Sequence, residues 1–217
     1  MSVEILGKIY NIETTIDLYF DNKNINEFPV NICKLTKLER LHLNRNKLTE
    51  IPKEIGNLIE LKYLYLEYNS LTEIPKEIGS LTNLNYLSLA NNELKEIPKE
   101  FDNLTNLNHL SLSTNKLKEI PKEICNLKNL KSIELYYNIL KEIPREIFKI
   151  RCVCIDINSY EIDNLNPECE FLIINHLQTP LLNLPFNLKE LYLVNHMIDI
   201  DTLKIPFGCR VITRWAD

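Results

Sequence analysis

Residues 58–80, LIELKYLYLEYNSLTEIPKEIGS, and residues 81–103, LTNLNYLSLANNELKEIPKEFDN, are two copies of one 23-residue pattern that decides the fold. The pattern runs through residues 35–149, and its five copies begin at Leu35, Leu58, Leu81, Leu104 and Leu127. A repeat of constant length is typical of a solenoid, in which each supersecondary unit stacks on its neighbours. The period therefore predicts an elongated domain built from stacked coils.

Each copy contains a strand signal followed by a turn signal. Leu64 and Leu66 alternate with other residues, which is the period of a short strand with one buried face. Pro75 comes after this strand and prevents further strand pairing, because proline has no N–H to donate. Gly56 and Gly79 stand shortly before new copies and are expected to permit the turn into the next coil.

The apolar positions of the pattern are expected to point inward, where each buried side chain contributes about 1.5–3 kcal/mol. Parallel strands lie about 4.8 Å apart, whereas the proline-bearing segments are bulkier, so the stack should curve. The predicted fold is an α/β solenoid, a curved right-handed coil with a parallel sheet of about nine or ten short strands on its concave face. Short irregular or 3-10 segments are expected on the convex face.

One polar residue type recurs at the same place in every copy, just after the strand. These residues are Asn46, Asn69, Asn92, Asn115 and Asn138. A buried amide can donate to and accept from the backbone groups that are left unpaired where a strand turns away. We therefore predict a structural ladder; the alternative is a polar row that binds a ligand.

The pattern L-x-x-L-x-x-L-x-L-x-x-N-x-L-x-x-I-P-x-x-I resembles the leucine-rich repeat family. Its ending, L-x-x-I-P-x-x-I, is similar to the 23-residue, intracellular, Ras-group subclass. A degenerate earlier copy spans residues 12–34 and has Lys23 at the asparagine position, as a terminal, capping repeat can have.

After Lys149 the strict period is lost. Leu184-Pro185-Phe186-Asn187-Leu188 and Ile205-Pro206-Phe207-Gly208-Cys209 resemble the FNIP-type repeats of amoebal and large-DNA-virus proteins. Further strands are predicted at Ile155-x-Ile157, Leu172-x-Ile174, Leu191-x-Leu193 and Ile212. We predict a single solenoid over residues 1–217, with a cap and degenerate repeat at 1–34, five regular repeats at 35–149, and irregular shorter repeats with a C-terminal cap at 150–217.

Composition argues against several classes of function. The chain has 217 residues and a net charge of −5, which argues against non-specific binding of nucleic acid, because such binding normally needs a basic surface. It lacks an apolar run of about 18 or more residues, so no membrane-spanning helix is expected. The first residues lack the apolar core of a signal peptide, and a cytoplasmic, intracellular location with reduced thiols follows as the expectation. Cys152-x-Cys154 does not fit zinc-ligand spacing, and we expect no metal and no cofactor.

Catalysis is not expected, because the four histidines fall on different coils and no nucleophile, metalloprotease or phosphate-binding motif is present. The residues that alternate with the buried leucines should face the concave side, and the predicted partner-binding set is Arg40, His42, Arg45, Tyr63, Tyr65, Tyr68, Tyr86, His109, Tyr136 and Tyr137. Tyrosine offers a large amphipathic contact area at low entropic cost. The alternative interpretation is that aromatic residues simply favour strands.

These observations predict a non-enzymatic protein–protein interaction module that binds a protein partner on its concave face, without nucleic acid, membrane or small-molecule cofactor. The repeated Glu-Ile-Pro-Lys-Glu-Ile segments, which include Lys76, are expected to form a solvated outer face. Two alternatives stay open. The chain could be the recognition subunit of a larger enzyme complex, such as a ubiquitin ligase or phosphatase adaptor, or a structural component of a viral particle.

Overall fold

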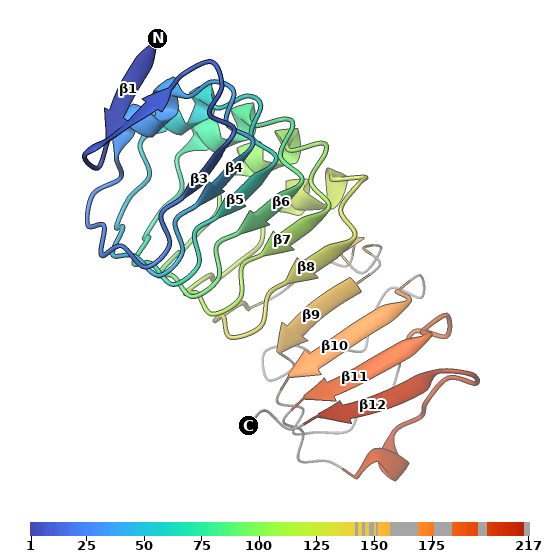
Figure 1. Ribbon diagram of the computed structural model, residues 1–217. Helices are drawn as coiled ribbons and strands as arrows, with labels where there is room; N and C mark the ends of the chain where they lie inside the picture. The colour runs from blue at the N-terminus through green and yellow to red at the C-terminus, as the bar shows by residue number, and fades with distance from the viewer. Residues whose placement is uncertain are drawn as a thin grey trace.

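The computed structural model describes residues 1–141, 143, 144, 146, 147, 150, 152–156, 169–175, 184–194 and 199–214. Ten strands form one parallel sheet in strict chain order from β3 to β12, and a two-stranded antiparallel hairpin, β1–β2, stands at the N-terminal end (Figure 1). The predicted curved solenoid with a parallel sheet of nine or ten strands is therefore confirmed, with ten.

The strands fall into a short and a long class. The N-terminal strands are β1 (Ser2–Ile5), β2 (Lys8–Asn11), β3 (Asp17–Tyr19), β4 (Arg40–His42), β5 (Tyr63–Tyr65), β6 (Tyr86–Ser88), β7 (His109–Ser111) and β8 (Ser132–Glu134). The C-terminal strands are β9 (Cys152–Asp156), β10 (Phe171–Asn175), β11 (Glu190–Val194) and β12 (Arg210–Arg214). In the parallel sheet, β3–β8 have three residues each and β9–β12 have five.

Short 3-10 helices cover the opposite side of the coils (Figure 1). They are η1 (Val30–Lys34), η2 (Lys53–Asn57), η3 (Lys76–Ser80), η4 (Lys99–Asn103), η5 (Lys122–Asn126) and, near the C-terminus, η8 (Ile200–Thr202). Each of η1–η5 begins directly after a proline. The Pro75 carbonyl, for example, accepts from Ile78 N at 3.0 Å, so the proline both ends the extended segment and starts the helical turn. No helix in the described ranges is long and apolar enough to cross a membrane.

The core is one continuous row of leucine-type side chains behind the sheet. Leu64, Leu87 and Leu110 are register partners on β5, β6 and β7, and each is fully buried. The same row continues through Ile133, Val153, Leu172 and Leu191. The regular coils and the C-terminal coils therefore share one hydrophobic core.

The role predicted for the glycines is wrong. Gly56 and Gly79 lie inside η2 and η3 and have negative φ, so they are not turn residues. A Cβ on Gly79 would lie 2.6 Å from the backbone oxygen of Glu100, and one on Gly56 would lie 3.0 Å from that of Glu77. These glycines permit neighbouring coils to stack closely. Positive φ occurs instead at the position just before each ladder asparagine, where Arg45, Tyr68, Asn91, Thr114 and Tyr137 stand.

The register predicted for the C-terminal third needs one correction. Ile133 pairs with Val153, so the inward pair on β9 is Val153 and Ile155, whereas Ile155-x-Ile157 was predicted. Ile157 lies outside the described residues. The physical reason is a shorter coil, because register partners from Ile133 onward lie 19 or 20 residues apart instead of 23. The strand predicted at Ile212 is confirmed as β12, where Val211 is the partner of Leu191 and Ile212 pairs with Tyr192 on the concave face.

The strands predicted at Leu172-x-Ile174 and Leu191-x-Leu193 are confirmed as β10 and β11, with all four side chains buried. The division into residues 1–34, 35–149 and 150–217 stays a prediction.

Candidate partner-binding surface

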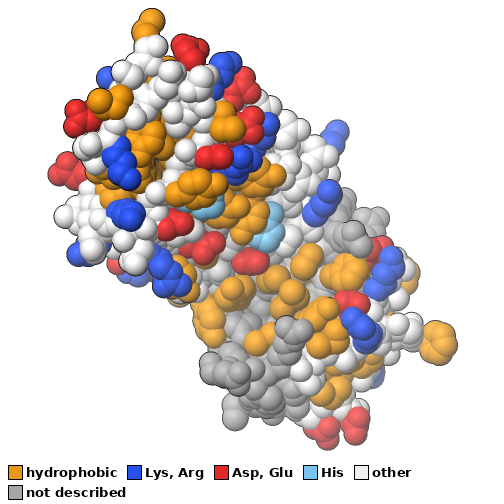
Figure 2. Space-filling view, viewed as in Figure 1, with side chains coloured by type: hydrophobic (Ala, Val, Ile, Leu, Met, Phe, Trp, Pro, Cys, Tyr) orange, Lys and Arg blue, Asp and Glu red, His pale blue; other side chains and the backbone are white. Residues whose placement is uncertain are grey.

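Aromatic and imidazole rings form a continuous stack across the concave face. The ring centroids are 4.7 Å apart for Tyr19–His42, 4.2 Å for His42–Tyr65, 4.9 Å for Tyr65–Tyr86 and 4.6 Å for Tyr86–His109. Neighbouring parallel strands are about 4.8 Å apart, so rings at equivalent positions are held at stacking distance by the sheet itself. Figure 2 shows the histidine side chains set among hydrophobic ones near the middle of this face.

Between β5 and β6 the stack passes from one row of register partners to the neighbouring row, because Tyr65 contacts Tyr86, which is not its register partner. Tyr65 has Ser88 as its register partner, and the small Ser88 side chain leaves the space beside the Tyr65 ring to Tyr86. Tyr86 and His109 are register partners in the adjacent row, and the stack follows that row. Tyr63, the register partner of Tyr86, is half-buried and makes no ring contact within the described chain.

Small residues lie beneath the rings on β6 and β7 and just after these strands. Ser88, Ala90, Ser111 and Ser113 all face the concave side, yet all are buried. The rings and carboxylates around them, not the solvent, therefore cover this part of the sheet. The Ser88 hydroxyl oxygen is buried and has no hydrogen-bond partner within the described part of the chain.

Two half-buried carboxylates accompany the stack. Glu134 accepts a hydrogen bond from Ser111 Oγ at 2.7 Å and has its Oε1 3.7 Å from His109 Nε2. The Glu67 carboxylate has no hydrogen-bond or ion-pair partner among the residues that the structure describes. Burial, followed by Glu67 and Glu134, raises the pKa of Tyr86 to about 12. At the centre of the concave face, Glu67 therefore carries negative charge that no cation among the described residues neutralises.

Arginine and histidine lie at the β3–β4 end of the stack. Arg40 Nε is 2.6 Å from Asp17 Oδ1, so this guanidinium is already paired within the chain. Burial is the main cause of a lowered pKa for His42, although Asp21 and Asp17 oppose that shift. His42 is therefore neutral at pH 7.

The predicted site residues do not form one cluster. His42, Tyr65, Tyr86 and His109 lie together in the stack. Arg45 and Tyr68 lie beyond the strands at positive φ, with the Arg45 guanidinium carbon 4.3 Å from the Tyr68 ring centroid, a cation–π contact. Tyr136 and Tyr137 form a separate edge-to-face pair after β8, with centroids 5.6 Å apart.

Sequence reasoning missed Tyr19 as a member of the site. It stands in the degenerate first copy, and its pairing with His42 could have been read from the 23-residue offset. Glu67 and Glu134 were also missed as site residues, because a single carboxylate on a strand has no sequence signature of its own.

The five asparagines lie behind the sheet, not on the concave surface. Asn92 Nδ2 donates to the carbonyls of Leu66, Leu89 and Ala90 at 2.9, 3.1 and 3.2 Å, and its Oδ1 accepts from Leu71 N at 3.0 Å. Asn69, Asn115 and Asn138 repeat this set. Asn46 also reaches the degenerate first coil, where its Oδ1 accepts from Lys23 N and Ile25 N. Each amide therefore connects neighbouring coils.

The cysteines show no metal-ligand geometry in the described ranges. Cys152 and Cys154 face the same side of β9, as register partners of Ser132 and Glu134. Contact with Cys152, then burial, raises the pKa of Cys154, and burial raises the pKa of Cys169 to about 12. All six cysteines are free thiols, and no three His, Cys, Asp or Glu side chains of the described residues gather as metal ligands.

Comparison with known proteins agrees with the repeat pattern. A family described as Leucine-rich repeat region matches residues 49–116, and the Leucine Rich Repeat family matches residues 37–58 and 106–127. No curated protein matches the sequence. These family matches support a leucine-rich repeat protein, and the curved coil with its parallel sheet is the leucine-rich repeat solenoid fold.

Solved leucine-rich repeat structures resemble the chain over most of its length. A leucine-rich repeat protein of Leptospira interrogans is 28% identical, with a TM-score of 0.53, and the match covers 89% of this chain and 64% of that protein. The plant peptide hormone receptor RGFR1, solved in complex with RGF2, is 28% identical, with a TM-score of 0.61 and coverage of 87% and 34%. Internalin C2 of Listeria monocytogenes shares the fold at 19% identity and a TM-score of 0.62, covering 92% of this chain and 80% of its own. The chain spans less than two thirds of the first two proteins.

Proposed function

We propose that this chain is a non-enzymatic interaction module that binds a protein partner on the concave face of β4–β7. The observation that carries the proposal is the ring stack from Tyr19 to His109, held at the spacing of the strands. Leucine-rich repeat proteins commonly bind other proteins. Two plant receptors that resemble this chain were solved with a bound ligand, RGFR1 with RGF2 and GASSHO1/SCHENGEN3 with CASPARIAN STRIP INTEGRITY FACTOR 2.

The stack suits binding because its side chains are already ordered. Protein interfaces concentrate their energy in a few aromatic and arginine anchors, and ordering a side chain on binding costs about 0.5–1.5 kcal/mol. Tyr65 and Tyr86 are each held between two other rings. Their side chains are therefore ordered before binding, and binding loses little further side-chain entropy. A partner would contact ring edges, hydroxyls and imidazole nitrogens, because the ring faces contact one another.

The charge of the surface favours a particular partner chemistry. Ionised carboxylates only accept hydrogen bonds, and Glu67 has no cationic partner among the described residues. A segment that presents lysine or arginine over β5–β8 would neutralise Glu67 and Glu134, and its backbone N–H groups could donate hydrogen bonds to them. An acidic segment would add like charge to a half-buried site.

The finer classification is part of the same proposal. L-x-x-I-P-x-x-I favours the Ras-group subclass and an intracellular location, where the six thiols stay reduced. The two proline-led segments at residues 184–188 and 205–209 favour an FNIP-like C-terminal part. The identity of a partner isolated from the native source would show which of three functions applies: a dedicated binding module, a subunit of an enzyme complex, or a component of a particle.

The test compares two faces of the same protein after a partner has been obtained by co-purification and mass spectrometry. Truncation of a central anchor costs about 2 kcal/mol or more, so Tyr65→Ala should weaken partner binding at least about tenfold. Tyr63→Ala, outside the stack, should weaken it less. Neither change should move the melting temperature much, because neither side chain belongs to the leucine core.

Lys76→Glu on the exposed outer face is the matched control and should leave both binding and melting temperature unchanged. Loss of binding in Lys76→Glu with full binding in Tyr65→Ala would place the function on the convex face and contradict the proposal.

A further inference from the structure

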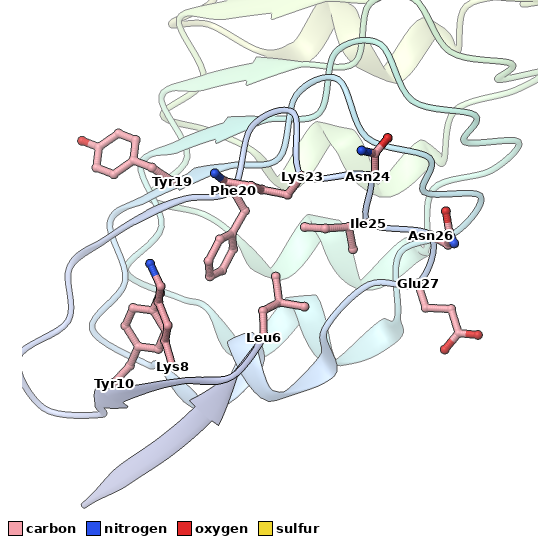
Figure 3. A pocket seen from close by; sticks show the side chains of 10 residues that line it. All are labelled: Leu6, Lys8, Tyr10, Tyr19, Phe20, Lys23, Asn24, Ile25, Asn26 and Glu27. Atoms are coloured by element: carbon pink, nitrogen blue, oxygen red, sulfur yellow. The ribbon is translucent and has the colours of Figure 1, made fainter.

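A cavity of about 710 Å³ lies at the N-terminal end of the solenoid, between the β1–β2 hairpin and the first coil (Figure 3). Phe20 and Ile25, both buried, supply apolar surface on the side of the coil. Leu6, about half exposed, and Tyr10 line the side of the hairpin. The volume is in the range of protein ligand sites, about 300–1,000 Å³, and half of the ten lining residues are apolar or aromatic.

The cavity lies beside the open edge of the ten-stranded sheet. β3 is the terminal strand and pairs only with β4 within the described chain. Phe20 N donates to His42 O at 2.8 Å, and Arg40 N donates to Ile16 O at 3.0 Å. The backbone N–H and C=O groups of the even-numbered residues in this segment therefore face β4. Backbone groups alternate in direction along a strand. The N–H and C=O groups of Asp17, Tyr19 and Asp21 therefore point away from the sheet, and Tyr19 lines the cavity.

Two lysines give the cavity a positive end. In Figure 3 the amino groups of Lys8 and Lys23 stand near Tyr19, whereas Glu27 lies at the opposite end. Both lysines are exposed, and neither has an ion-pair partner in the part of the chain that the structure describes. An anionic group placed between them would therefore gain two favourable interactions.

We propose that this edge binds an extended acidic–apolar peptide segment by strand addition to β3. The peptide backbone pairs with the outward groups of Tyr19 and its neighbours. An apolar side chain packs on Phe20 and Ile25, and an acidic side chain two residues away lies between Lys8 and Lys23, because alternate side chains of a strand share a face.

A second copy of this chain fits the edge less well than a peptide. Pairing two β3 edges would bring Lys8 and Lys23 of both copies to one seam, where like charges repel. The inference is independent of the concave-face proposal, since it concerns the end of the coil. Tyr19 borders both surfaces, so the test leaves Tyr19 unchanged.

The experiment selects displayed random heptapeptides on the full chain, with counter-selection on the Lys8→Glu/Lys23→Glu variant. Enriched sequences should combine an acidic and an apolar residue two positions apart, and a synthetic copy should bind at least about tenfold more weakly to the double variant. Lys37→Glu, an exposed lysine outside the cavity, is the control and should bind like the wild type. Melting temperatures of all three proteins establish that they are folded.

Strand addition is tested on the ligand itself. The backbone N–H groups of an extended peptide point alternately to its two edges, and only one edge can pair with β3. N-methylation of alternate residues in two complementary peptides should abolish binding for one peptide and spare the other. The inference is overturned if no selected peptide distinguishes wild type from the double variant, if the enriched sequences lack acidic residues, or if both methylated peptides bind.

Discussion

The coils of β4–β8 and those of β9–β12 build the same hydrophobic row with two different backbone schemes. The regular coils pair only three residues per strand, and their hydrogen bonding continues through contacts such as Leu66 N to Ser88 O and through the asparagine ladder. The C-terminal coils pair five residues per strand and are three or four residues shorter. The regular coils therefore combine short strands with side-chain amides, whereas the C-terminal coils pair longer strands.

The concave surfaces of the two regions differ as well. On β4–β7 the outward positions carry a ring stack with carboxylates beside it. On β9–β12 the same rows include Cys154, Phe171, Ile173 and Ile212, and Figure 2 shows hydrophobic side chains over much of this lower part of the face. Charged and hydrogen-bonding groups make a surface selective for a particular partner, whereas the hydrophobic effect is non-directional and selects less between partners. The regular coils are therefore the better candidate for selective recognition.

The largest expected effect comes from truncating the row that both regions share. Leu87 and Leu191 are fully buried, so Leu87→Ala and Leu191→Ala should each lower the free energy of unfolding by about 2–5 kcal/mol. Urea denaturation followed by circular dichroism should give one transition in each variant, because the core is continuous. A Leu191→Ala protein that unfolds in two separate steps would show that the regions are independent domains.

The regular coils could be predicted from the sequence because one 23-residue pattern fixes strand, proline turn and asparagine at constant spacing. The C-terminal register could not, because Val153 and Ile155 precede an equally apolar Ile157 and the coil length changes at that point. The role of Gly79 was predicted wrongly because its close approach to Glu100 is a contact between neighbouring coils, which the sequence of one repeat does not reveal. The composition of the ring stack was partly foreseen, but its row change at Ser88 depends on side-chain size across strands.

A smaller effect is expected from the asparagine ladder of the regular coils. Asn92→Leu removes four hydrogen bonds and leaves the buried Leu71 N–H without an acceptor, whereas the carbonyls of Leu66, Leu89 and Ala90 keep other donors; the change should cost about 1–3 kcal/mol. Urea midpoints measure the change. The control is Asn91→Gly, because Asn91 has a φ of 55° and glycine adopts this φ without strain. Equal midpoints for the two variants would contradict a stabilising role for the ladder.

The smallest expected effect concerns pH and the ring stack. Burial lowers the pKa of His42 below its ordinary 6.5, against the opposing influence of Asp21 and Asp17 and with a minor contribution from Arg40. The unfolded chain therefore binds more protons just below pH 6.5, so stability should fall as the pH drops through that value. His42→Phe keeps a ring in the stack and should reduce the loss of melting temperature between about pH 7.5 and about pH 5.5. An equal loss in both proteins would show that His42 is not the group responsible.

The most direct test of the account is to locate the bound partner by site-specific photo-crosslinking. A benzoyl-phenylalanine residue would replace Tyr65 on the regular concave face, Tyr192 on the C-terminal concave face, or Lys76 on the convex face, one at a time. Crosslinking to the co-purified partner should be strong from position 65, weaker from position 192 and absent from position 76. Strong crosslinking from position 76 with none from position 65 would contradict recognition by the concave ring stack.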